Sequence, residues 1–284
     1  MQILILGMHR SGTSLITRMV NMMGAYVGPE GSMLELTQDN PKGYWERNDV
    51  LNYNIFLLRL HGVDWAGYNP APWPMPCYPR ELPPPLLTRL QALVFNMDAH
   101  RPWVMKDPRL CITLPYWKKL LEVPVCVVVH RDPLEIAESL NRIRHARNPV
   151  PHERGLALWE FYTVALLNAS VDLPRVFVDH ADFFRDPIAA TARLYHGLVA
   201  QGLQALRLPS DREINAFIDP GLYRSKPKEQ VTRADATGSA ALALTDRQRE
   251  LTTMLLGQKP HSSELAVSEE SMRLLQQPIE LIDP

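Results

Sequence analysis

The feature that most constrains the fold of this chain is the loop "GMHRSGTS", which begins at Gly7. It follows the short apolar run "ILIL" and precedes "LITRMVNMMG", where apolar residues recur at helical spacing. A buried strand, a glycine-containing loop and a helix in this order can form an anion cradle, because backbone N–H groups point outward at the helix N-terminus. A strand–helix turn that binds nothing has the same pattern, so both interpretations stay open at this point.

Strand-like and helix-like segments alternate along most of the chain. The run "VPVCVVVH" is almost continuously apolar, as in a parallel strand that is covered on both faces. This alternation predicts the α/β class: a three-layer, mainly parallel sheet with flanking helices, similar to P-loop NTPases. The predicted strands are residues 2–6, 103–107, 123–130 and 175–180, and the predicted helices are residues 13–24, 51–61, 85–98, 132–145, 155–170, 186–205 and 245–256.

Some segments carry more specific expectations. We expect the helix over 155–170 to be amphipathic, and Gly24 to end the helix that follows the loop. Proline is dense from Asn69 to Pro85, which predicts an extended surface segment, either a lid or an acceptor-site loop. The pattern weakens toward the C-terminus, so we expect one domain over residues 1–284 with a regular core over residues 1–206.

Composition limits the classes of function. Hydrophobic residues make up 46% and charged residues 21%, which is typical of a soluble globular protein. The net charge of -1 argues against broad binding of nucleic acid or anionic membrane. No apolar stretch approaches the ~20 residues of a membrane span. Cys77, Cys111 and Cys126 lack metal-ligand spacing, so we expect reduced core thiols, no metal and a cytoplasmic protein.

The loop matches a nucleotide-binding P-loop only in part. Gly7 and Gly12 have the right spacing and Ser14 stands at the Ser/Thr position, but Thr13 replaces the lysine. Nucleotide hydrolases need that lysine on the β- and γ-phosphates, so its absence disfavours this class. Arg10, inside the loop, can supply the missing cation.

Four segments together resemble a known family. The segments are "HRSGTSL", "VMKDPRL", "VVVHRDPLEIAESL" and "VFVDHADFFRDPIAATARLYHGL". Over residues 1–195 the chain resembles the sulfotransferases that use 3′-phosphoadenosine 5′-phosphosulfate. The resemblance implies this donor as co-substrate, a single P-loop-like α/β domain, and sulfuryl transfer without a metal.

The resemblance also implies a donor site. The family's loop holds the 5′-phosphosulfate, with a basic residue, here Arg10, on the bridging and sulfuryl oxygens. An arginine at the end of a strand and a serine eight residues later hold the 3′-phosphate, here Arg131 and Ser139. An arginine at that edge can fork onto a phosphate. The donor-binding residues expected on this basis are His9, Arg10, Ser11, Gly12, Thr13, Ser14, Arg131 and Ser139. His9 either faces this site or forms local hydrogen bonds.

The resemblance leaves the general base open. Animal cytosolic members use a histidine two residues after the lysine of the "VMKDP" strand, and this chain has Pro108 there. Other members use a glutamate downstream of the first helix, for which Glu46 in "KGYWE" is the best match and Glu35 the second. His9 and Asp107 stay open as further candidates.

We expect Arg10, Glu46 and Lys106 to be the catalytic residues. Arg10 would stabilise the charge that develops on the leaving group, and Glu46 would accept the acceptor's proton. Lys106 follows a buried strand at the edge where α/β ligand sites lie, and either binds acceptor or sulfuryl oxygens or pairs with Asp107 as a structural charge. Tyr44, Trp45, Trp65 and Trp73 could line an acceptor pocket or pack ordinarily.

The most economical hypothesis is a sulfotransferase whose acceptor is a hydroxyl or amine of a glycan or small natural product. A P-loop kinase or nucleotide hydrolase with a degenerate loop is the alternative, and it requires Mg²⁺ and ATP. A non-catalytic nucleotide-binding protein is a third possibility. No heptad or apolar stripe predicts an oligomeric state.

Overall fold

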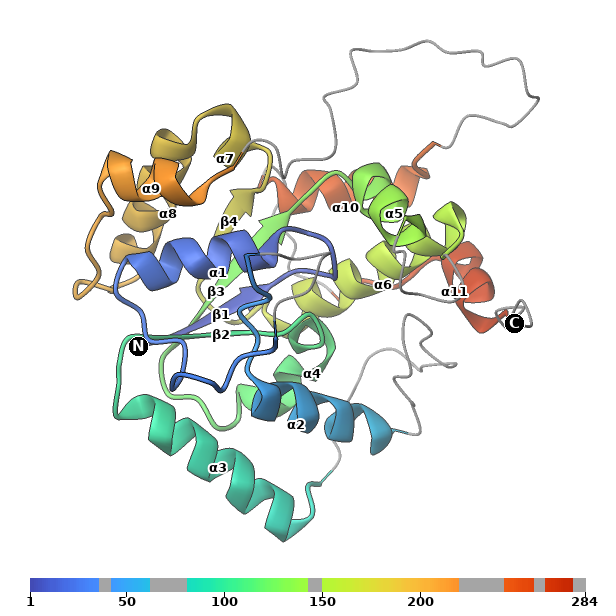
Figure 1. Ribbon diagram of the computed structural model, residues 1–284. Helices are drawn as coiled ribbons and strands as arrows, with labels where there is room; N and C mark the ends of the chain where they lie inside the picture. Colours follow the sequence, from blue (N-terminus) through green and yellow to red (C-terminus); the bar gives the residue numbers. More distant parts are fainter. Residues whose placement is uncertain (36–41, 62–80, 143–149, 220–242, 258–263, 278–284) are drawn as a thin grey trace.

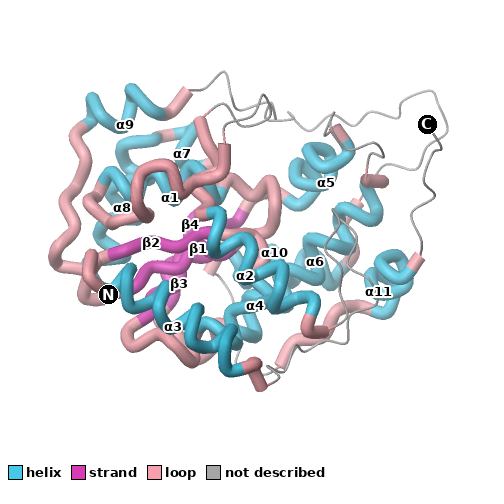
Figure 2. The backbone as a smooth tube through the Cα atoms, turned by 60° about the horizontal axis from the view of Figure 1, so that its bottom comes forward, coloured by secondary structure: helices cyan, strands magenta, loops and turns pink. Residues whose placement is uncertain are grey.

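A computed structural model describes residues 1–35, 42–61, 81–142, 150–219, 243–257 and 264–277. Four parallel strands form its sheet in the order β2-β1-β3-β4, and Figure 2 shows these strands in magenta among the helices. Their bounds are β1 Gln2–Leu6, β2 Trp103–Lys106, β3 Pro124–His130 and β4 Arg175–Asp179. All four predicted strands are thereby confirmed, each to within a residue. The register pairs Leu4 of β1 with Met105 of β2 and Cys126 of β3.

Helices cover both faces of the sheet, which confirms the predicted three-layer α/β class (Figure 1). Alternate residues of a strand point to opposite faces, and here both sets are apolar. Ile3 and Ile5 of β1 face α1 and α8, whereas Leu4 and Leu6 face the layer that contains α4 and α6. The helices are α1 Thr13–Met22, α2 Asn48–Arg59, α3 Pro84–Asp98, α4 Leu110–Trp117, α5 Pro133–Asn141, α6 His152–Ala169, α7 Asp182–Arg185, α8 Pro187–Ala200, α9 Asp211–Phe217, α10 Asp246–Leu255 and α11 Glu269–Gln276.

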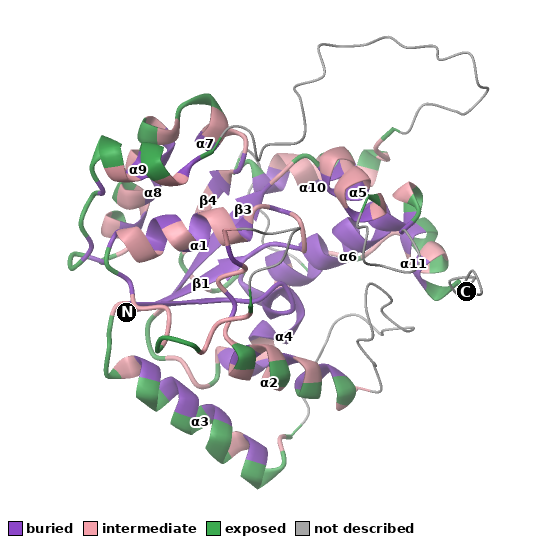
Figure 3. Cartoon of the chain, in the orientation of Figure 1, coloured by how far each residue is buried: buried purple, intermediate pink, exposed green. Residues whose placement is uncertain are grey.

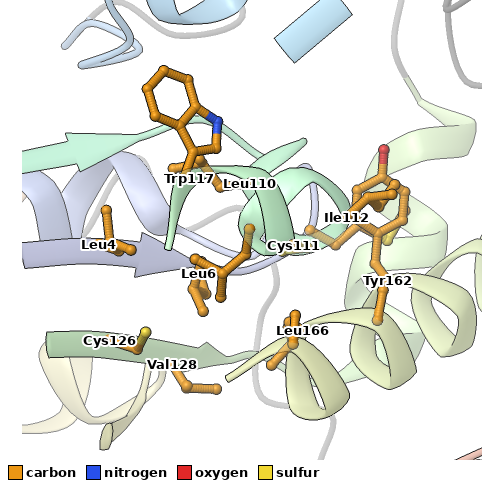
Figure 4. Close-up of a cluster of buried hydrophobic side chains, with 14 of the residues drawn as sticks. Leu4, Leu6, Leu110, Cys111, Ile112, Trp117, Cys126, Val128, Tyr162 and Leu166 are labelled. Atoms are coloured by element: carbon orange, nitrogen blue, oxygen red, sulfur yellow. The ribbon is translucent and has the colours of Figure 1, made fainter. Parts of the chain in front are cut away.

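The core on the α6 side of the sheet joins strands to helices that are distant in sequence. Figure 4 shows Leu6 of β1 and Val128 of β3 with Cys111 of α4 and Leu166 of α6. Cys111 and Cys126 are buried free thiols, and burial raises the pKa of each to about 12. The prediction of reduced core thiols is confirmed for these two, and Cys77 lies outside the described residues.

The expectation that α6 is amphipathic was wrong. Fifteen of its 18 residues are buried, and Figure 3 shows it enclosed along almost its whole length. A helix that is buried all round packs on several neighbours at once. Here α4 and α5 cover one part of α6 and the C-terminal helices α10 and α11 cover another.

Two buried charged residues of α6 hold the C-terminal helices. The Glu160 carboxylate accepts hydrogen bonds from the Ser268 backbone N–H (2.6 Å) and from the Ser271 hydroxyl (2.7 Å). The Arg154 guanidinium donates to the Leu274 and Gln277 carbonyls at 2.8 and 2.7 Å. These bonds provide partners for helix-end groups that would otherwise be unsatisfied. They connect the weakly patterned C-terminal part to the core.

Several elements differ from the sequence expectations. α4, α7, α9 and α11 are helices that the pattern did not predict. Gly24 follows α1 in a left-handed conformation (φ 107°), as predicted for the end of this helix. α3 begins at Pro84, because proline is tolerated in the first turn of a helix, and most of the proline-rich segment lies outside the described residues. None of the helices in the described parts of the chain has the length and apolar character needed to cross a lipid bilayer.

Candidate active site

The carboxyl ends of all four strands carry polar residues on one edge of the sheet. The loop from Gly7 to Gly12 follows β1, Lys106 ends β2, Arg131 follows β3 and His180 follows β4. Ligands of open parallel α/β sheets bind at this edge, because the strand ends and the helix N-termini converge there. The parallel topology therefore brings together groups that are up to 168 residues apart in sequence, since His180 lies directly against Gly12.

The loop after β1 turns tightly into α1. Arg10 and Gly12 both have left-handed backbones, with φ values of 68° and 83°. A Cβ atom on Gly12 would lie 1.9 Å from Cδ2 of His180, and one on Gly7 would lie 2.8 Å from Cγ2 of Thr13. Both glycines are therefore required by close approach, and Gly12 also by its backbone angle.

Three of the predicted donor-binding residues form direct contacts. Nε of Arg10 donates a hydrogen bond to the Ser139 hydroxyl at 2.9 Å. Nη1 of Arg131 donates to the backbone carbonyl of Arg10 at 2.6 Å, and its Nε forms an ion pair with Glu135 at 3.0 Å. The loop after β1 is thus linked to α5 and to the residues just before it through two arginines and one serine. The contact of Ser139 is with Arg10, whereas the eight-residue spacing paired Ser139 with Arg131; their shared role at a 3′-phosphate stays a prediction.

A second cluster surrounds Lys106. Its ammonium forms a buried ion pair with Glu46 and donates to the Tyr44 carbonyl at 3.2 Å and to the Ser14 hydroxyl at 3.4 Å. The Ser14 hydroxyl in turn donates to the Tyr44 carbonyl at 3.0 Å. The structure thereby brings two of the expected catalytic residues, Glu46 and Lys106, to the first turn of α1.

Asp107 does not pair with Lys106, which corrects one of the two interpretations of these charges. Its carboxylate is fully buried and pairs with the Arg109 guanidinium at 3.2 Å, and it also accepts the Arg109 backbone N–H at 2.7 Å. Neighbouring residues at the end of a strand point to opposite sides, so each finds a different partner. The second glutamate candidate, Glu35, is exposed.

Burial changes the proton affinity of two candidate bases in opposite directions. Burial raises the pKa of the Glu46 carboxyl, and the Lys106 ammonium opposes this effect. Burial lowers the pKa of His9 well below its usual value, and Arg109, Lys106 and Arg10 lower it further. The His9 ring therefore stays neutral near pH 7, with its edge against Tyr162 at a centroid distance of 5.8 Å.

His180 was not found by sequence reasoning. Burial, followed by the charges of Arg131 and His130, lowers the pKa of His180 to about 3. Its backbone N–H donates to the His130 carbonyl at 2.9 Å, which extends the β3–β4 pairing to the edge where Gly12 lies. Its position at the end of a predicted strand was the one sequence feature that could have indicated His180. Its close approach to Gly12 depends on tertiary packing and cannot be predicted from the sequence pattern.

The aromatic candidates are only partly described. The Trp45 ring lies on the guanidinium of Arg18, with 4.9 Å from Cζ to the ring centroid. Trp65 and Trp73 lie outside the described residues. Within the parts of the chain that the structure describes, no group of three or more His, Cys, Asp or Glu side chains is arranged to hold a metal ion.

Fold and site together define an α/β protein with a glycine loop at the carboxyl edge of a parallel sheet, flanked by two arginines and a buried lysine–glutamate pair. The sequence model of the sulfotransferase family matches residues 2–201, and the chain belongs to this family.

Two solved structures match this chain over most of its length. The sulfotransferase domain of the Synechococcus PCC 7002 olefin synthase has 15% identity and a TM-score of 0.42, over 96% of this chain and 92% of that chain. The sulfotransferase domain of the curacin biosynthetic pathway also has 15% identity, with a TM-score of 0.39, over 96% of this chain and 95% of that chain. No curated protein sequence matches this chain.

The contact between Gly12 and His180 predicts a specific loss of stability. Gly12→Ala should lower the free energy of unfolding by about 1–2 kcal/mol for the left-handed backbone and by roughly 1–3 kcal/mol more for overpacking against His180. Gly31→Ala is the matched control, because Gly31 has φ 76° and no atom within 4 Å of an added Cβ. Urea unfolding measures both, and equal losses for the two variants would contradict the contact.

The lowered pKa of His180 predicts a dependence of stability on pH. Between the unfolded pKa of 6.5 and the folded pKa of about 3, only the unfolded chain binds this proton. The free energy of unfolding therefore falls as pH falls through that window. From pH 7 to pH 5 the wild-type protein should lose about 2 kcal/mol more than His180→Gln. Urea unfolding at the two pH values checks this, and a variant that retains the full wild-type loss would exclude His180 as its source.

Proposed function

We propose that the chain transfers a sulfuryl group from 3′-phosphoadenosine 5′-phosphosulfate to a hydroxyl or amine acceptor. The observation that carries this proposal is the contact of Arg10 with Ser139 and of Arg131 with the Arg10 carbonyl. A donor with phosphates at both the 5′ and 3′ positions needs cations and hydroxyls from two separate segments at one place. Family membership and this arrangement support the same donor.

The donor's 5′-phosphosulfate would lie on the loop after β1. The backbone N–H groups at the start of α1 favour an anion there. Ser11, Gly12, Thr13 and Ser14 would donate to it, and Arg10 would supply the positive charge. Arg131 and Ser139 would hold the 3′-phosphate. A guanidinium has five N–H donors, so Arg10 can keep its bond to Ser139 while it contacts the phosphosulfate.

The reaction we propose is an in-line displacement at sulfur. The acceptor oxygen forms a bond to sulfur as the bond from sulfur to the bridging oxygen breaks, and the electron pair remains on that oxygen of adenosine 3′,5′-bisphosphate. The acceptor's proton passes to the Glu46 carboxylate. Arg10 and Lys106 stabilise the charge that develops on the leaving and transferring oxygens. His9, next to Arg10 and held neutral, would offer one further hydrogen bond to the donor.

Glu46 is the base that the geometry favours among the candidates. It is buried and contacts Lys106, which would face the sulfuryl group. Asp107 is committed to Arg109, and Glu35 is exposed. A buried carboxyl whose pKa is raised is a stronger proton acceptor than an exposed one. A glutamate-type base fits an alcohol acceptor, and we propose a glycan or small natural product in a cytoplasmic setting.

Donor binding is the direct test. Adenosine 3′,5′-bisphosphate should bind with micromolar strength, about −8 kcal/mol, in calorimetry without Mg²⁺, and ATP should bind more weakly. Arg131→Ala should raise the Kd of the bisphosphate at least tenfold. Arg142→Ala is the control, because Arg142 is an exposed arginine that pairs with Glu138 at the end of α5. Tighter binding of ATP that requires Mg²⁺ would contradict the proposal and favour a kinase or hydrolase.

Replacing the proposed base should separate chemistry from donor binding. Glu46→Gln should lower kcat about 100-fold or more and change the bisphosphate Kd less than about twofold. Burial raises the pKa of Glu46, and the base must be ionised to accept a proton. As pH decreases, wild-type kcat should therefore begin to fall at a pH above the usual pKa range of a glutamate. Sulfuryl transfer from labelled donor across an acceptor panel measures kcat. A Glu46→Gln variant with wild-type kcat would show that another group removes the proton.

A further inference from the structure

The two residues on either side of Trp45 contact the same ammonium group. The Tyr44 carbonyl accepts from Lys106 at 3.2 Å, and the Glu46 carboxylate forms an ion pair with Lys106. Trp45 stands between them in a left-handed conformation, with φ 56°. This conformation is uncommon for a residue with a bulky side chain and persists only where its surroundings hold it.

The surroundings of the Trp45 side chain are well defined. Its ring lies over the Arg18 guanidinium at 4.9 Å, and its indole N–H donates to the Lys42 carbonyl at 3.0 Å. Arg18 also lies 5.8 Å from the Phe217 ring, and the Lys42 ammonium lies 4.9 Å from the same ring. Lys42 in addition donates to the Phe217 carbonyl. Two cations and two aromatic rings thus connect α1, the segment around Trp45 and the end of α9.

The backbone of Glu46 and of the residue after it is held by contacts with residues 33 and 34. The Leu34 N–H donates to the Glu46 carbonyl at 2.8 Å, and Met33 and Arg47 form an antiparallel bridge. On the N-terminal side of Glu46, the Trp45 side chain contacts Lys42 and Arg18, and the Tyr44 carbonyl contacts Lys106. The left-handed turn takes the indole to Arg18 and leaves the Tyr44 carbonyl and the Glu46 carboxylate on Lys106.

We propose that Trp45 is a positioning residue, which sets the Glu46 carboxylate and the Tyr44 carbonyl against Lys106 through its contact with Arg18. The catalytic part of this inference rests on the proposed function, in which Glu46 is the base. The structural part, the coupling of Trp45 to the Lys106 cluster, does not. The sequence left acceptor-pocket lining and ordinary packing open for Trp45, and this proposal gives its ring a third role, on Arg18.

Kinetics test the catalytic part. Trp45→Ala should lower kcat about tenfold, equivalent to about 1.4 kcal/mol, because a displaced base loses its geometry. The KM for the donor should change less than about twofold, since Arg10, Arg131 and Ser139 would hold the donor, whereas Trp45 contacts Arg18 and Lys42. Trp45→Phe keeps a ring over Arg18 and should retain kcat to within about threefold. The control is Phe95→Ala, which removes an aromatic side chain that is 76% exposed on α3.

Two kinetic results would overturn the inference. One is a Trp45→Ala variant with wild-type kcat. The other is a Trp45→Phe variant as impaired as Trp45→Ala, because the ring on Arg18 would then not be what positions Glu46. A loss in Trp45→Ala confined to KM for the acceptor would assign the ring to an acceptor pocket instead, and would also reject positioning.

A thermodynamic cycle tests the structural part without donor or acceptor. Unfolding in urea is measured for Trp45→Ala, Lys106→Met and the double variant. If Trp45 acts through the Lys106 cluster, Trp45→Ala should shift the urea midpoint less in the Lys106→Met background than in the wild type. Additive shifts would overturn the coupling. Where Lys106→Met does not fold, Glu46→Gln takes its place, since it keeps the Tyr44 contact.

The test of the proposed function and the test of the positioning role can give negative results independently of each other. A wild-type protein that transfers no sulfuryl group and binds no bisphosphate would refute the proposed function, and the cycle would still decide whether Trp45 positions Glu46. A protein that transfers sulfuryl groups and shows additive shifts would keep the function and lose the positioning role.

Discussion

The parallel pairing of β1 with strands on both sides is the constraint on which the rest of the structure depends. All five residues of β1 are buried, and both edges are hydrogen-bonded, to β2 and to β3. Because β1 is central and its neighbours are parallel to it, the chain leaves β1 at the carboxyl edge of the sheet and must turn there into a helical crossover before it can form the next strand. The loop of Gly7 to Gly12 performs this turn, and the neighbouring strands place Lys106, Arg131 and His180 around it.

The charges at this edge are arranged as separate pairs. Lys106 pairs with Glu46, Asp107 with Arg109, and Arg131 with Glu135. A buried charge without a partner is very unfavourable. Asp107 and Arg131 find partners two and four residues away, but Lys106 pairs with Glu46, 60 residues earlier in the chain. The segment around Trp45 therefore packs where it brings Glu46 to Lys106 and the first turn of α1.

The sheet, the loop and part of the site were predictable because they depend on local pattern. Short apolar runs predicted the strands, and the structure brings Arg10, Arg131 and Ser139 to one edge of the sheet, because the carboxyl ends of parallel strands meet there. The environment of α6 was not predictable. Its polar positions suggested an exposed face, but Glu160 and Arg154 instead bind the C-terminal helices. Periodicity cannot distinguish a solvated polar face from one that is satisfied by distant partners.

By itself the sequence determined the α/β class, the strand–loop–helix order around Gly7 and Gly12 and the residue types at the carboxyl edge, because these follow from strand and helix propensity and from glycine's backbone freedom. Tertiary structure alone decided which charges pair, that Lys106 takes Glu46 and not Asp107, and that His180 lies against Gly12. Those choices depend on contacts between segments tens of residues apart, and on the cost of burying a charge or a ring edge where only one arrangement provides a partner.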